Sequence, residues 1–187
     1  MIAADLLAQA EHDYRTRVGL ITTSEELGQK VLSEIERQLQ TLRTREVAGA
    51  AWADQGEIAV CDSEDSMIAY SDHVAAEHLQ VHTRDPHATA KKLSSYGSLF
   101  IGELASVVYS DKCCGTNHTL PTMAGGRYTG GLWVGSYLKV CTHQWMEPKG
   151  VAQVAPHAVR QAGNEGQWGH QAAAEYRLKM LGINNRL

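Results

Sequence analysis

The sequence predicts an α/β fold, with a mostly parallel sheet and flanking helices over residues 1–125 and a small helical module over residues 126–187. Apolar runs typical of strands alternate with segments of helical periodicity as far as about residue 102. Repeated strand–helix units imply parallel pairing, because each parallel connection needs a crossover. Beyond Met123 the sequence becomes rich in glycine, and the later segments have helical patterns without strands. The chain is therefore expected to contain an α/β unit and a separate helical tail.

The first predicted elements are a helix over residues 3–12 and a strand over residues 18–22. Leucine and alanine recur at helical spacing in the first segment, which places Gln9 and His12 on one face of the helix. The second segment, VGLIT, is short and almost continuously apolar, as buried strands of parallel sheets are. Two polar side chains are thus presented together just before the sheet begins.

The clearest amphipathic segment follows Ser24. Either Thr23 or Ser24 provides a hydroxyl that can cap the start of a helix. Apolar residues then recur every three or four positions: Leu27, Val31, Ile35, Leu39 and Leu42. This spacing predicts a long helix that buries one face against the rest of the α/β unit.

The remaining elements of the α/β unit alternate in the same way. Further helices are expected over residues 46–53, 66–73 and 86–95, the last with a proline in its first turn. Further strands are expected over residues 58–61, 79–82 and 98–101. The series is that of a Rossmann-like sheet, but the phosphate-binding turn G-x-G-x-x-G is absent from the sequence. The predicted fold is therefore a partial Rossmann-like unit.

The composition excludes several classes of protein. Hydrophobic residues make up 43% and charged residues 20% of the 187, which is typical of a globular protein and not of a disordered one. The formal net charge of −4 offers no basic surface to nucleic acid or anionic lipid. No apolar run is long enough to span a membrane, and the first residues lack the basic region of a signal peptide. We expect a cytoplasmic protein with neither nucleic acid nor membrane as a partner.

Four groups of polar residues have the chemistry of an enzyme site: Gln9 with His12, Glu77 with His78, Asp111 with Asn117 and His118, and Glu165 with His170. A catalytic zinc ion takes nitrogen and oxygen ligands and keeps one position open, and His12, Asp111 and His170 offer three such ligands. Glu77 and His78 are adjacent at the start of a strand, so their side chains diverge. Divergent side chains suit acid–base chemistry better than joint ligation of one ion. Any one of these groups, taken alone, is more commonly solvated surface.

The adjacent residues Cys113 and Cys114 are interpreted as packing residues in a loop beside the site. The four cysteines show no C-x-x-C spacing, which argues against a disulfide framework. Thiolates bind zinc well, but two adjacent cysteines chelate a single ion poorly. A packing role is the simpler interpretation.

Five motifs, LLAQAEH, AAEHL, DKCCGTNHTLPT, a glycine-rich segment and EGQWGH, resemble in their order and spacing the histidinol dehydrogenase family across essentially the whole chain. The resemblance implies that the family's zinc ligands correspond to Gln9, His12, Asp111 and His170. It implies a catalytic pair at Glu77 and His78. It also implies that the residues in contact with substrate are His118 and Glu165.

The resemblance implies an activity. Members of the family use zinc and two NAD molecules to oxidise an alcohol through an aldehyde to a carboxylate. By analogy, His78 takes the hydroxyl proton and Glu77 activates the water that hydrates the aldehyde. The substrate is expected to be L-histidinol, giving L-histidine, or a paralogous alcohol such as 2,3-dihydroxypropane-1-sulfonate. The stretches SYGSLFIGE and DKCCGTNH look closer to the branch that includes sulfopropanediol dehydrogenases.

The resemblance also implies a homodimer whose helical tail is exchanged between subunits. In such a dimer His118, Glu165 and His170 of one chain reach the other site residues of its neighbour. The glycine-rich stretch AGGRYTGG suits a flexible connection to the tail. The alternative is a tail that folds back on the α/β unit of its own chain.

Two departures from the family pattern affect what the chain is expected to do. Ala76 stands where proline usually precedes the Glu-His pair, which removes a restraint on residue 75. Family chains are more than twice as long, and most of their NAD pocket lies in the N-terminal part, so this chain is expected to be an incomplete enzyme that binds NAD weakly. The alternative functions are a non-catalytic zinc-binding or dimerisation remnant and a zinc hydrolase in which Glu77 activates water.

Overall fold

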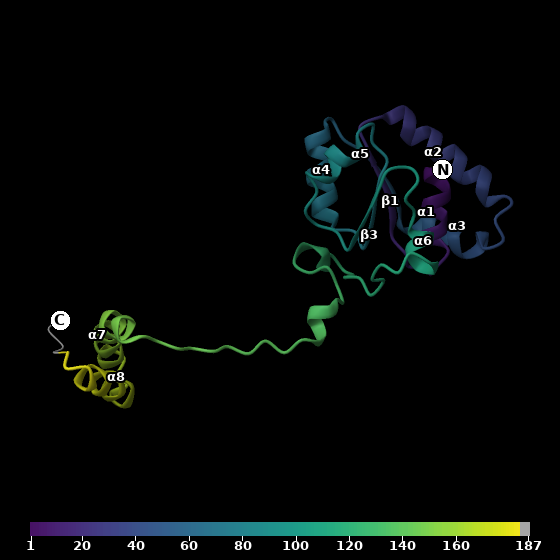
Figure 1. The fold of residues 1–187 in the computed structure, drawn as a ribbon. Helices are drawn as coiled ribbons and strands as arrows, with labels where there is room; N and C mark the ends of the chain where they lie inside the picture. The colour runs from purple at the N-terminus through teal and green to yellow at the C-terminus, as the bar shows by residue number, and fades with distance from the viewer. Residues whose placement is uncertain (184–187) are drawn as a thin grey trace. The chain divides into compact units, whose positions relative to one another are not determined.

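The computed structural model describes residues 1–183 and contains two units, Met1–Leu138 and Lys139–Leu187 (Figure 1). The first unit holds the strands and six of the helices, and the second holds a pair of helices. The last four residues of the predicted tail, 184–187, lie outside the described residues. The expected α/β class with a helical C-terminal pair is therefore confirmed.

The division between the units falls after Leu138, whereas the sequence pattern placed it after residue 125. The reason is that the glycine-rich stretch packs within the first unit. Gly125 and Gly126 are both buried, and a Cβ added to Gly126 would lie 2.7 Å from the carbonyl carbon of Tyr96. Glycine permits this close approach of two backbone segments.

Four strands form two parallel pairs. β1 (Val18–Thr22) pairs with β2 (Gly56–Val60), and β3 (His78–Val81) pairs with β4 (Ser98–Ile101). The predicted parallel pairing is confirmed, although the pairs belong to two separate sheets of two strands each. The strands are also more exposed than their apolar sequences suggest, since Val60 is 51% exposed.

Helices lie on both sides of these strands in Figure 1, with α1 to α3 on one side and α4 and α5 on the other. Their bounds, followed by those of a further helix after β4, are α1 (Ile2–Ala10), α2 (Glu25–Leu39), α3 (Arg45–Gln55), α4 (Glu64–Val74), α5 (Pro86–Ala90) and α6 (Val107–Lys112). The backbone N–H of Leu27 donates to the Ser24 hydroxyl at 3.2 Å, which confirms the predicted cap of α2. Ile35 on α2 is fully buried in a core shared with α1, α3 and β1.

Two short helices differ from the predictions for physical reasons. α5 ends at Ala90 and not near residue 95, because the residues that follow it hydrogen-bond to Asp72 of α4. Its carboxylate accepts bonds from the backbone N–H groups of Ser94 and Ser95, each at 2.9 Å. α6 was not predicted, since six residues are too few to show helical periodicity.

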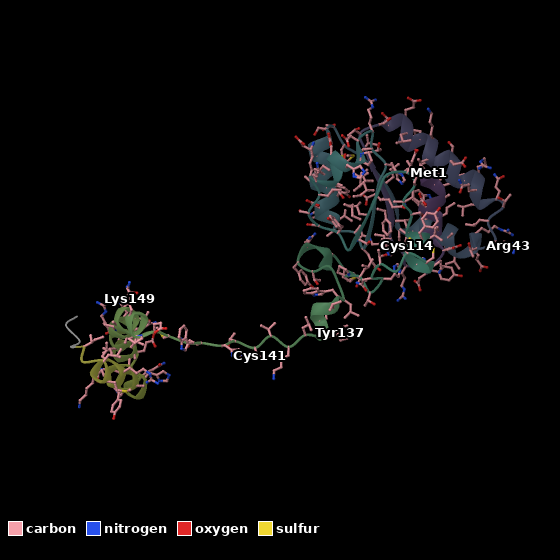
Figure 2. All side chains as sticks on the ribbon, viewed as in Figure 1. Met1, Arg43, Cys114, Tyr137, Cys141 and Lys149 are labelled. Carbon is pink, nitrogen blue, oxygen red and sulfur yellow. The ribbon has the colours of Figure 1, made fainter. Side chains whose placement is uncertain are left out.

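The second unit is a helical hairpin of α7 (Pro148–Asn164) and α8 (Trp168–Met180). Its small core is built from Ala155, Val159 and Leu178. Gly166, with φ of +70°, forms the turn between the helices, a conformation that favours glycine. Residues 139–147 form an extended and exposed stretch, on which Cys141 is labelled in Figure 2.

Among the residues that the structure describes, no helix is both long and apolar enough to cross a lipid bilayer.

Ile35→Ala is expected to reduce the free energy of unfolding of the first unit by roughly 2–5 kcal/mol, because it leaves a cavity in the shared core. Leu27→Ala, on the same helix but 36% exposed, is the matched control. Its expected effect is within about 0.5 kcal/mol. Urea unfolding followed by circular dichroism measures both. Equal losses in the two variants would contradict the structure, in which Ile35 is buried and Leu27, at the start of the same predicted stripe, is exposed.

Candidate metal and catalytic site

Three side chains from neighbouring segments of the first unit converge on one point. His78 begins β3, Asp111 lies in the last turn of α6, and His118 follows in the next loop. One potential ligand atom from each lies within 4.8 Å of the others. His118 Nε2 is 2.8 Å from Asp111 Oδ1, and the rings of His78 and His118 stack with centroids 5.2 Å apart.

The polar atoms at this point are buried but unsatisfied. His78 Nε2 and Asp111 Oδ1 have no hydrogen-bond partner within the described part of the chain. The short distance from Asp111 to His118 is therefore a close approach without the alignment of a hydrogen bond. A buried carboxylate oxygen without a partner is costly, and such groups commonly mark a bound ion. The residues present fit a divalent cation with nitrogen and oxygen ligands.

Backbone pairing fixes where His78 and its neighbour Glu77 lie. The N–H of Gly97 donates to Ala76 O at 2.9 Å, and the N–H of Ser98 donates to Glu77 O at 2.8 Å. A Cβ on Gly97 would lie 2.5 Å from Glu77 O, so only glycine allows this approach. These bonds start the β3–β4 ladder at the acid–base pair predicted from the sequence.

The residues just before this pair have an unusual conformation. Ala75 ends α4 with φ of 50° and ψ of 58°, in the left-handed region. A proline at position 76 would restrict residue 75 to extended conformations. Because Ala76 stands there instead, the turn from α4 into Glu77 is compatible with the left-handed geometry.

Local hydrogen bonds order the loop between Asp111 and His118. The hydroxyls of Ser110 and Thr116 lie 2.7 Å apart, and the Asn117 carboxamide oxygen accepts from the N–H of Thr119 at 3.0 Å. Cys113 and Cys114 are exposed, and neither is among the three converging side chains. Cys114 is labelled in Figure 2. The pair thus lies in a loop beside the site, as interpreted from the sequence, but its exposure does not support a packing role.

The face of α1 supplies further ligand candidates. Gln9, His12 and Asp111 all line one surface pocket formed by α1, β3 and α6. Three of the four residues implied as zinc ligands therefore share a pocket. Glu77 and Cys114 are not part of its lining.

Two of the implied residues belong to the second unit. Glu165 caps the C-terminal end of α7, where its carboxylate accepts a bond from the Gln161 side chain at 3.1 Å. His170 lies in the first turn of α8. Both are exposed at the same end of the helical hairpin, next to the Gly166 turn. Their exposure leaves both side chains accessible to solvent.

Sequence reasoning missed other polar residues of the pocket. Asp5, Gln80 and Ser106 line it as well, and His82 lies beside Asp5. One signal was available, because Asp5 precedes Gln9 by four positions and so occupies the same face of the helix. The other residues come from separate elements, and no sequence spacing connects them.

The ring of His78 is neutral near pH 7. Burial lowers its pKa from the usual value of 6.5, with smaller contributions of the same sign from His118 and His12. The carboxylates of Glu77 and Asp111 oppose this shift but do not cancel it. A neutral imidazole can accept a proton, which is the state that a general base requires.

In the metal-free protein we expect the His78 ring to titrate below 6.5. Since the folded-state pKa is lowered, the unfolded state binds the proton more readily, and stability falls as the pH drops below about 6.5. Histidine ring NMR between pH 4 and 8 measures the pKa, and a His78→Gln spectrum assigns the signal. A pKa above the usual value would contradict the burial argument.

The sequence and fold match known proteins along nearly the whole chain. The sequence profile described as histidinol dehydrogenase matches residues 1–178. A histidinol dehydrogenase homolog from Shouchella clausii is 46% identical over 97% of this chain and 43% of its own length. A sulfopropanediol 3-dehydrogenase from Ruegeria pomeroyi is 42% identical over 95% of this chain and 41% of its own length.

A solved structure agrees with these matches. The crystal structure of histidinol dehydrogenase from Elizabethkingia anophelis has a TM-score of 0.89 and 36% identity, covering 97% of this chain and 42% of that one. The chain therefore spans less than half the length of these proteins. On the family profile, the sequence identities and the shared fold, the chain belongs to the histidinol dehydrogenase family.

Proposed function

We propose that this chain provides the zinc-binding and acid–base groups of an NAD-linked dehydrogenase that oxidises a primary alcohol through an aldehyde to a carboxylate. The observation that carries the proposal is the buried Asp111 carboxylate. Its Oδ1 lies beside two histidine rings without a hydrogen-bond partner in the described part of the chain, and the side chain shares a pocket with Gln9 and His12. Family membership supplies the reaction class.

Two sets of zinc ligands include Asp111. The first is Gln9, His12, Asp111 and His170, of which three line the same pocket. The second is His78, Asp111 and His118, whose atoms already converge. We favour the first set because it leaves His78, whose pKa is lowered by burial, free to act beside Glu77 as a base.

A zinc ion held by these ligands would polarise the alcohol oxygen, and NAD would accept the hydride in each of the two oxidation steps. Nε2 of His78, which is buried and has no hydrogen-bond partner among the described residues, would accept the hydroxyl proton. Glu77 then removes a proton from the water that adds to the aldehyde. His118 and Glu165 bind the substrate.

Sequence identity favours one substrate for the first tests. The chain is 42% identical to the Ruegeria sulfopropanediol 3-dehydrogenase and 38% identical to a Cereibacter sphaeroides histidinol dehydrogenase. We therefore propose that 2,3-dihydroxypropane-1-sulfonate be tested first and L-histidinol second. Either compound has the primary alcohol that the acid–base pair requires.

We also propose that two copies of the chain complete each other's sites, with Glu165 and His170 supplied by the tail of a second copy. His118 was expected to reach the neighbour as well, but it lies 2.8 Å from Asp111 of its own chain and is left out of the exchanged set. Exposed aromatic residues support this proposal. Trp133, before the extended stretch, and Trp145, within it, are 70% and 80% exposed. Large exposed apolar side chains grouped along one segment commonly mark an interface.

Removing one ligand of the favoured set is expected to weaken zinc binding by at least about 100-fold. Even substitution of a residue that only hydrogen-bonds to a ligand lowers metal affinity by about 10–100-fold. The variants are His12→Ala and Asp111→Ala, measured by competition with a chromophoric chelator. Cys113→Ser and Cys114→Ser, on the loop beside Asp111, are controls that should bind zinc like the parent.

The variant His78→Gln distinguishes the two ligand sets. It should keep zinc if His78 is a base and lose it if His78 is a ligand. Full zinc affinity in both His12→Ala and His170→Ala would rule out the favoured set.

A shared site predicts complementation between two defective chains. His12→Ala and His170→Ala each damage both sites of a homodimer, whereas a mixed dimer regains one intact site. Purified mixed dimers, isolated with two different affinity tags, are expected to hold about half the zinc of the parent dimer. Zinc-free mixed dimers formed from two folded variants would refute the exchange of tails.

A further inference from the structure

We propose that Asp5 is a positioning residue for the metal site. Its carboxylate fixes the position of α1 relative to β3 and α6. This inference rests on the proposed function, because it assumes that Gln9 of α1 and His12, in the turn directly after α1, bind zinc together with Asp111 of α6. It assigns a role to a side chain that carries none in the reaction described above.

The carboxylate of Asp5 connects three elements that carry site residues. The Ser106 hydroxyl, at the start of α6, donates to Asp5 Oδ1 at 3.3 Å. Nε2 of His82, which directly follows β3, lies 3.7 Å from Asp5 Oδ2. The side chains of Asp5 and His82 are only 20% and 14% exposed, so water screens this pair weakly.

The apolar contacts of α1 do not fix its position relative to α6. Ala3, Leu7 and Ala10 of α1 belong to a core shared with α2, α3 and β1. Within the described residues, the Ser106–Asp5 bond is the one side-chain hydrogen bond between α1 and α6. A second polar link from α1, between Glu11 and Thr44, leads instead to the N-cap of α3.

The buried polar atoms around Asp5 explain why its charge matters. Both ring nitrogens of His82 and Oε1 of Gln80 lack hydrogen-bond partners in the part of the chain that is described. The Asp5 carboxylate is the nearby group that can offset the cost of burying the His82 ring. Without it, the pocket wall formed by these residues is free to repack and α1 to shift.

A small shift of α1 affects the proposed ligands unequally. Gln9 lies about one turn beyond Asp5, and His12 about two turns beyond it. A rotation or translation of the helix moves both relative to Asp111, which belongs to a different element. Metal sites require ligand positions held to within roughly 0.5 Å.

A structural role of a different kind predicts other results. Asp5 lies in the first turn of α1, where a carboxylate also favours the helix dipole. That role would reduce stability in an Asp5 variant without altering the geometry of a bound metal. The experiment therefore compares metal binding with stability in the same proteins.

The test uses Ser106→Ala and Thr44→Val in the full chain. Each substitution removes one hydroxyl that donates to a carboxylate of α1, but only the first link leads to α6. Asp5→Asn and Asp5→Ala change the acceptor of the same Ser106–Asp5 hydrogen bond. The readouts are zinc affinity, the visible spectrum of the Co²⁺ complex and the urea midpoint.

We expect Asp5→Ala to weaken zinc binding by about 10–100-fold, which is the usual effect of substituting a residue that supports the metal ligands. Ser106→Ala should weaken it by a smaller factor, and the effects of the two should not add, because they remove one link. The Co²⁺ spectrum should change in Asp5→Asn and Ser106→Ala and remain unchanged in Thr44→Val, even if the urea midpoint falls equally in all three.

Parental zinc affinity and an unchanged Co²⁺ spectrum in Ser106→Ala and Asp5→Asn would overturn the positioning role while leaving the proposed function intact. Absence of zinc binding in the parent chain would overturn both. If Asp5→Ala fails to fold, the comparison of Ser106→Ala with Thr44→Val decides the question.

Discussion

Burial of the Asp111 carboxylate beside two histidine rings is the interaction on which the organisation of the candidate site depends. The side chain is only 12% exposed, and its Oδ1 finds no hydrogen-bond partner among the described residues. Such a group is tolerated where positive charge compensates it. The elements that surround it, α1, β3 and the loop after α6, each contribute a nitrogen-bearing side chain at or near this point.

The backbone is arranged to keep these side chains in place. Parallel pairing of β3 with β4 begins at Glu77, and it depends on the close approach allowed by Gly97. The same pairing sets His78 opposite Ser98. Helix α1 is held against α2 and α3 by its core contacts, and Asp5 provides its polar link to the start of α6. A rigid scaffold thus presents acid–base groups from a strand and ligand candidates from a helix, which limits the motion of both.

We proposed that His78 acts as a base and His12 as a zinc ligand, and these roles follow from the different environments of the two side chains. His78 is half-buried between the rings of Phe100 and His118, and burial lowers its pKa. His12 is exposed at the end of α1, where solvent and metal can reach it. Under the proposed function, environment and not residue type would separate the base from the ligand.

The sequence by itself determined the fold class, the order of the main elements and the residue types of the site. Strong local signals made this possible: the Ser24 cap and the apolar stripe through Ile35 act within one helix. Tertiary structure decided the end of α5, where Asp72 captures the chain, and the packing of the glycine-rich stretch on the first unit. It alone brought Asp5, His82 and Ser106 together across the α1, β3 and α6 elements. Contacts between distant segments have no sequence periodicity, because they depend on how completed elements pack and not on the spacing of residues within one element.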